Sequence, residues 1–139
     1  MNNNKTAVSS GELMIGNWIS YRGEKNCLVA SIGYEFATEY PDTANRNGSD
    51  DVNEYVGIPL TPEIMEKCGF EKTITKMRIL DYEDYRKGNF VLSVIGKGVE
   101  VEYGALNIED RTYIAVFKYL HQLQNLYWCL TGEHLKIEL

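Results

Sequence analysis

The segment from Tyr119 to Leu135 constrains the fold more than any other part of the chain, because it reads as an amphipathic helix with a defined end. Its apolar residues recur at steps of three and four, which places them on one stripe of an α-helix. The stripe consists of Leu120, Leu123, Tyr127 and Leu130, and Val116, just before the segment, extends it. Gly132 follows this stripe and can take the left-handed conformation that ends many helices. We therefore predict a C-terminal helix that packs its apolar face on a core.

Most of the chain before this helix has the pattern of β-strands. Short runs rich in β-branched and aromatic residues alternate with turn residues. The predicted strands span residues 13–19, 26–32, 72–82, 89–95, 99–103 and 111–117. The tripeptide Gly96-Lys97-Gly98 is a strong hairpin signal, because both glycines permit a positive φ angle. Such short connections favour antiparallel pairing, since parallel strands need long crossovers.

A short helix is predicted between these strands. Thr61 can cap its first turn, Pro62 suits the first helical position, and Glu63 is favourable to the helix dipole. Gly69 provides its stop signal. Together the elements predict an α+β fold: a twisted antiparallel sheet, or a small, partly open barrel, with a short inserted helix and a C-terminal helix packed on the sheet.

The length of 139 residues and the hydrophobic content of 44% suit one domain with one core. We predict a disordered tail at residues 1–10 and a single domain at residues 11–139. Cys27, Cys68 and Cys129 form no CxxC pair and fit reduced thiols. The sequence shows no apolar run of membrane-spanning length and no signal peptide. These features predict a cytoplasmic protein without a membrane partner.

Residues 34–56 are predicted to form a long, mobile acidic loop. They carry six acidic residues against the single base Arg46, together with turn-forming proline, asparagine and glycine. Two interpretations remain open: a solvated insertion without a task, or a docking loop for a basic partner, which includes imitation of nucleic-acid charge. In the docking interpretation Asp50, Asp51 and Glu54 are the binding residues. Their spacing differs from that of an EF-hand, so we predict no metal site.

Aromatic residues offer a second candidate surface. Tyr40 and Tyr55 frame the acidic loop, and Tyr119 and Trp128 flank the apolar stripe of the C-terminal helix. Core packing accounts for most aromatic side chains, but binding surfaces and dimer interfaces are also rich in them. Both interpretations stay open from the sequence, and so does a homo-oligomer.

Several functional classes are disfavoured by the sequence. The net charge is −6, and the lysines between residues 67 and 78 are interleaved with acids, so direct binding to nucleic acid is not expected. The chain has only two histidines, His121 and His134, and a structural role for His121 is the simpler reading. The motifs of dinucleotide, phosphate-loop, zinc-protease and nucleophile-elbow sites do not occur. We therefore predict a protein that is not an enzyme and holds no cofactor.

An alternative is a protein that binds or sequesters a small, nucleotide-type ligand. The chain has ten tyrosines, which offer a large surface for stacking on a base. A phosphate group would need basic side chains or backbone amides, such as those of Arg86-Lys87-Gly88. Because tyrosines without a basic cluster are more often structural, this ligand-binding function is the second choice.

Three longer motifs carry a resemblance to a known family. They are LMIGNW at residues 13–18, IPLTPEIMEKCGF at residues 58–70 and YLHQLQNLYWCLTGEHL at residues 119–135. Together they resemble small uncharacterised proteins of phages and prophages of Bacteroidales. The resemblance implies a phage-associated origin and an α+β fold with a β-rich front half, but no activity, cofactor or catalytic residue. With the other functional classes disfavoured and this origin implied, we expect a non-catalytic interaction protein of the host cytosol that binds a protein partner, with host defence as one candidate target.

Overall fold

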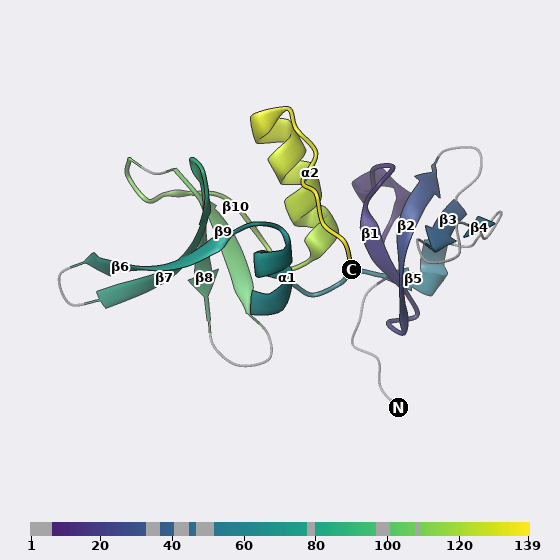
Figure 1. Cartoon of the computed structure of the whole chain (residues 1–139), viewed down its shortest axis with the longest axis horizontal. Coiled ribbons are helices and arrows are strands. Elements are labelled where there is room, and N and C mark those ends of the chain that lie inside the picture. The colour runs from purple at the N-terminus through teal and green to yellow at the C-terminus, as the bar shows by residue number, and fades with distance from the viewer. Residues whose placement is uncertain are drawn as a thin grey trace. The chain divides into compact units, whose positions relative to one another are not determined.

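The computed structural model describes residues 7–32, 37–40, 45–46, 52–77, 80–96, 101–107 and 109–139. The chain divides into two units, each with one five-stranded antiparallel sheet (Figure 1). The first unit comprises Met1–Pro59 and Tyr119–His134, and the second comprises Leu60–Lys118 and Leu135–Leu139. Among the described strands neither sheet closes on itself, so the α+β class is confirmed with open sheets rather than with a barrel. The single domain at residues 11–139 stays a prediction.

The sheet of the first unit has the strand order β4-β3-β2-β1-β5. Its strands are β1 (Trp18–Tyr21), β2 (Lys25–Ser31), β3 (Ala37–Tyr40), β4 (Asn45–Arg46) and β5 (Tyr55–Val56). A tight turn joins β1 to β2, with φ angles of 53° at Arg22 and 78° at Gly23. Strand β1 starts at Trp18 rather than at residue 13, because the Asn17 amide donates to the Met14 carbonyl at 3.0 Å and closes a turn there.

The core of the first unit combines β1, β2 and β5 with the segment that precedes β1. Its buried residues are Val8, Leu13, Ile19, Cys27, Val29 and Tyr55. Two 3₁₀ turns, η1 (Ser10–Glu12) and η2 (Val52–Glu54), precede β1 and β5. Val8 donates its amide to the Tyr55 carbonyl at 3.0 Å, and Ala7 pairs with Val56. Residues 7 and 8 therefore join the folded unit instead of the predicted tail, while residues 1–6 lie outside the described residues.

The sheet of the second unit has the strand order β10-β9-β8-β7-β6. Its strands are β6 (Glu71–Met77), β7 (Leu80–Lys87), β8 (Phe90–Ile95), β9 (Glu102–Leu106) and β10 (Tyr113–Phe117). The strand predicted at residues 72–82 was wrong as one element, because Met77 pairs with Leu80 and the segment is divided between β6 and β7. Antiparallel pairing of β8 with β9 agrees with the predicted hairpin, although residues 97–100 lie outside the described part.

The short helix α1 (Pro62–Lys67) forms as its local signals predict. The Thr61 hydroxyl accepts the Ile64 amide at 3.2 Å, and Pro62 occupies the first turn. Gly69 adopts a φ angle of 88° and ends the helix. Met65 of this helix is buried, as are the aromatic residues of the second unit's core. These are Phe70, Tyr85, Phe90, Tyr103 and Phe117.

The C-terminal helix α2 spans Leu120–Thr131 and ends at Gly132, which has a φ angle of 73° (Figure 1). Leu120, Leu123 and Tyr127 of the predicted stripe are buried. The other two members, Val116 and Leu130, are exposed, so their assignment to the core stripe was wrong. Val116 lies in β10, because the helix starts only after Tyr119.

Candidate functional site

The predicted acidic loop is only partly described, and its described part contains strand and 3₁₀ structure. Asp50 and Asp51 lie outside the described residues. Glu54 ends η2 and accepts a hydrogen bond from the Arg22 side chain at 2.7 Å, in a pair whose partners are both well exposed. This hydrogen bond is the main reason that the pKa of Arg22 is raised above its ordinary value. Glu54 therefore contacts its own unit, and the loop's role as a docking segment stays a prediction.

The aromatic residues predicted to bind a partner lie in very different surroundings. Tyr55 is fully buried, and its hydroxyl lies 2.9 Å from the Thr38 hydroxyl, so it serves the core of the first unit. Tyr40 belongs to β3, but its side chain is outside the described set. Tyr119 is half-buried and stacks on the ring of His121. Trp128 is 38% exposed and stacks on His134 with ring centroids 4.5 Å apart.

The first and last motifs of the family resemblance contact each other within the first unit. Asn17 donates to the side-chain oxygen of Asn125 at 2.9 Å, and the Trp18 amide donates to Gln124 at 2.8 Å. Gln124 returns a hydrogen bond to the Gly16 carbonyl at 3.2 Å. The amide side chains of helix α2 thus bind the turn before β1 and β1 itself. These motif residues stabilise the fold of the first unit, so their presence needs no catalytic role to explain it.

The middle motif joins the same arrangement through backbone contacts. The Leu120 amide donates to the Ile58 carbonyl at 2.8 Å, and Pro59 pairs with Tyr119. Gly57 lies against the Tyr119 ring so closely that a Cβ atom there would be 2.5 Å from Cγ of the tyrosine. Only glycine fits at this position, because no real Cβ atom comes so near another carbon.

Of the two histidines, only His121 is buried, and it is therefore the one to consider as a catalytic residue. Its Nε2 atom lies 3.1 Å from a carboxylate oxygen of Glu12, whereas its Nδ1 atom has no partner among the described residues. Burial lowers the pKa of His121, and the neighbouring Glu12 carboxylate only partly offsets this effect. The ring is fully buried, and Cys129 lies on exposed surface further along the helix. This geometry gives His121 a packing role.

No group of three or more histidine, cysteine, aspartate or glutamate side chains within the described ranges is placed to hold a metal ion. Arg86 and Lys87, of the segment suggested to bind a phosphate group, make other contacts. Lys87 donates to the Cys68 carbonyl at 2.7 Å, and the Arg86 guanidinium lies 3.9 Å from the Asp84 carboxylate. These contacts do not favour the nucleotide-type ligand.

A buried ion pair on one face of the second sheet was not visible in the sequence. Arg111 donates to both carboxylate oxygens of Asp84, at 3.1 and 3.2 Å, and the Asp84 side chain is fully buried. The Thr75 hydroxyl donates to the same carboxylate at 2.7 Å. Burial by itself would raise the pKa of Asp84, but the hydrogen bonds from Arg111, Thr75 and Ser93 lower it below its ordinary value. The guanidinium also lies over the Tyr82 ring, 4.3 Å from its centroid.

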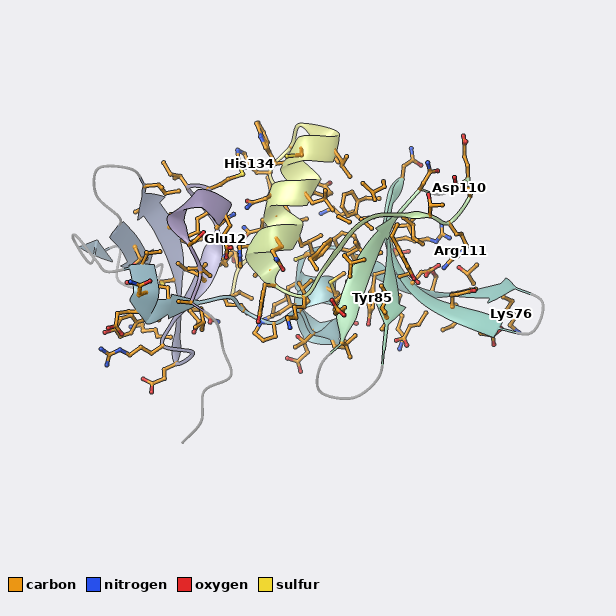
Figure 2. All side chains as sticks on the ribbon, turned by 180° about the vertical axis from the view of Figure 1, so that it is seen from behind. Glu12, Lys76, Tyr85, Asp110, Arg111 and His134 are labelled. Carbon is orange, nitrogen blue, oxygen red and sulfur yellow. The ribbon has the colours of Figure 1, made fainter. Side chains whose placement is uncertain are left out.

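The turn that leads into β10 carries Asp110 and Arg111 (Figure 2), and the ion pair of Arg111 with Asp84 holds this turn to the sheet. Arg111 adopts a φ angle of 56°, which is unusual for a residue with a side chain. Its amide donates to the Asn107 carbonyl at 2.9 Å, and Asp110 accepts two hydrogen bonds from Thr112. The turn from residue 107 to 112 is therefore held to the sheet at its base, and it sets where β10 begins.

Among the described side chains of the second unit, three of the four exposed large hydrophobic residues lie in β10. Tyr113, Ile114 and Val116 are 51%, 54% and 47% exposed, and the strand contains no charged residue. It lies at the end of the sheet next to β9, with no further strand beside it in the described part of the chain (Figure 1). The Tyr113 ring covers Gly104, where an added Cβ atom would lie 2.5 Å from the ring. An edge strand of this kind offers backbone donors and acceptors together with apolar side chains.

The strand at the opposite edge of the same sheet, β6, differs from β10 because it carries charged residues. Strand β6 has the sequence EKTITKM, in which charged and threonine residues surround the single exposed isoleucine, Ile74. Lys72 of this strand pairs with Glu83 of β7 at 2.7 Å. Lysine on an edge strand discourages pairing with another chain, because the charge would have to be desolvated. Of the two edges, β10 is therefore the one suited to binding.

Comparisons with protein-family models, with curated proteins and with solved structures found no match to this chain. Within the described residues, no helix is both long enough and apolar enough to cross a membrane. The function of the chain must therefore be inferred from its own residues, and β10 is the candidate site that they support best.

Proposed function

We propose that this chain is a non-catalytic protein-interaction module that binds an extended segment of a partner protein along β10. The observation that carries the proposal is the uncharged edge strand Tyr113–Phe117 with three half-exposed apolar side chains. An extended segment that adds to such an edge gains main-chain hydrogen bonds, and the alternate side chains supply specificity. The motif resemblance to phage and prophage proteins supports a partner among the proteins of the phage or of its host, including those of host defence.

The arrangement around β10 supports binding by a preformed site. The Asp84–Arg111 ion pair holds the preceding turn, and β9 pairs with β10 on the other side. A strand that is already extended and fixed loses little conformational entropy when a partner binds, which raises affinity. The partner has to supply an apolar, extended segment, because a charged segment would be desolvated against Ile114 and Val116 without an opposite charge.

The proposal is tested by comparing partner capture by three proteins. The purified chain is immobilised as wild type, as Val116→Lys on β10, and as Ile74→Lys on β6. Ile74 is 54% exposed and lies on the opposite edge of the same sheet, so it is a matched control. Bound proteins are identified by mass spectrometry and then tested with purified components. We expect Val116→Lys to lose a partner that wild type and Ile74→Lys retain. Equal capture by all three proteins would refute binding at β10.

A further inference from the structure

We infer that the segment bound by β10 is β10 of a second copy of this chain, so that the two second-unit sheets pair edge to edge in a symmetric dimer. This inference rests on the proposed function, since it names the partner of the same edge. A two-fold symmetric interface must be complementary to itself. Strand β10 meets this requirement in its sequence and in the charges at its two ends.

The order of side chains in β10 is nearly the same from both directions. Tyr113 and Phe117 are aromatic, Ile114 and Val116 are β-branched, and Ala115 lies at the centre. An antiparallel pairing about Ala115 places Ile114 of each copy opposite Val116 of the other. Cross-strand pairs of β-branched residues stabilise a sheet, and here both partners are half exposed in the single chain.

The charges near the ends of β10 are also complementary under this symmetry. Asp110 lies in the turn before the strand, Lys118 directly follows the strand, and both residues are exposed. In the antiparallel arrangement, the end that carries Asp110 of one copy meets the end that carries Lys118 of the second copy. Side chains diagonal to one another across a strand pair are within reach of long residues. The symmetric dimer therefore brings opposite charges together twice, once at each end of the paired strands.

The geometry also sets the strength of the dimer. A register shift between Tyr113 and Ala115 interrupts the regular pairing of β10 with β9. The carbonyl of Lys118 already accepts the Leu60 amide at 2.9 Å, so the free edge ends at Phe117. A dimer that pairs through such a short, bulged edge buries less surface between its subunits than an obligate dimer does. We therefore expect a reversible, concentration-dependent dimer rather than a permanent one.

The test is sedimentation velocity of the full chain from micromolar to millimolar concentration. Wild type and Ile74→Lys are expected to dimerise as the concentration rises, whereas Val116→Lys is expected to bind itself about tenfold more weakly or worse. A second experiment exchanges the charges at the two ends of β10. Asp110→Lys and Lys118→Asp should each weaken the dimer, and the double variant Asp110→Lys/Lys118→Asp should recover it. Circular dichroism confirms that each variant is folded.

The outcomes distinguish this inference from the proposed function. A wild type that stays monomeric at millimolar concentration overturns the symmetric dimer, and a Val116→Lys protein that dimerises like wild type overturns it as well. If the monomeric wild type captures another protein and Val116→Lys does not, the proposed function stands with a different partner. If neither self-association nor capture depends on β10, both fail. Recovery in the charge-exchanged double variant supports the symmetric register.

Discussion

Replacing Arg111 with alanine is expected to destabilise the second unit, because it leaves a buried carboxylate without its main partner. Arg111 supplies two hydrogen bonds to Asp84, whose side chain is fully buried. After the change, Asp84 keeps the Thr75 hydroxyl at 2.7 Å, the hydrogen bond from Ser93 and the distant guanidinium of Arg86 at 3.9 Å. Removal of one partner from a buried ion pair costs about 3–5 kcal/mol. Since these three contacts remain, we expect a loss at the lower end, about 3 kcal/mol.

The assay is urea-induced unfolding followed by circular dichroism, with Lys72→Ala as the matched control. Lys72 and Glu83 form a shorter ion pair, 2.7 Å, but both side chains are well exposed. Water screens an exposed ion pair, so Lys72→Ala should unfold at nearly the same urea concentration as wild type. In the double variant Asp84→Asn/Arg111→Ala the buried charge is gone, and part of the lost stability should return. An Arg111→Ala protein that unfolds together with Lys72→Ala would refute the energetic role assigned to this pair.

Two further predictions concern the first unit. Burial lowers the pKa of His121 below 6.5, so the unfolded chain binds more protons in the range just below that pH. Stability should therefore fall as the pH drops from about 6.5 towards the folded-state pKa, by up to about 1.4 kcal/mol per pH unit from this residue. The free energy of unfolding of wild type and of His121→Gln, measured at several pH values, checks this prediction. The same dependence on pH in both proteins would contradict it. Gly57→Ala should cost about 1–3 kcal/mol, because its new methyl group overlaps the Tyr119 ring. Thermal unfolding measures the loss, which should shrink when Tyr119 is also replaced by alanine.

The features that the sequence predicted correctly are those set by neighbouring residues. Thr61, Pro62 and Gly69 determine where α1 starts and ends, and Gly132 determines the end of α2. Such capping signals act within one turn of helix, so they can be recognised from a short stretch of sequence. The antiparallel pairing of the sheets followed in the same way from short connections.

The features that the sequence missed depend on pairing between distant residues. The segment at residues 34–56 was interpreted by its charge, but β3 forms within it because Thr38 pairs with Val29 of β2. The boundary between β6 and β7 was missed, since no glycine, asparagine or proline marks a turn near residues 77–80.

The candidate site was the hardest feature to predict. Residues 111–117 were recognised as a strand, but a strand pattern does not say whether both of its sides are paired. The position of β10 at the edge follows from the order of five strands, which no local signal reports. The pairing of Asp84 with Arg111 likewise depends on two residues that are far apart in the chain.

Backbone hydrogen exchange along β10 tests the central claim most directly. Exchange is measured by mass spectrometry on the full chain, in dilute solution and then with the binding partner present, which is concentrated chain or the captured protein. If β10 is the binding edge, the peptide that contains Tyr113–Phe117 becomes protected while the β6 peptide Glu71–Met77 does not change. Unchanged exchange in β10, with new protection around Trp128 or elsewhere, would contradict the account.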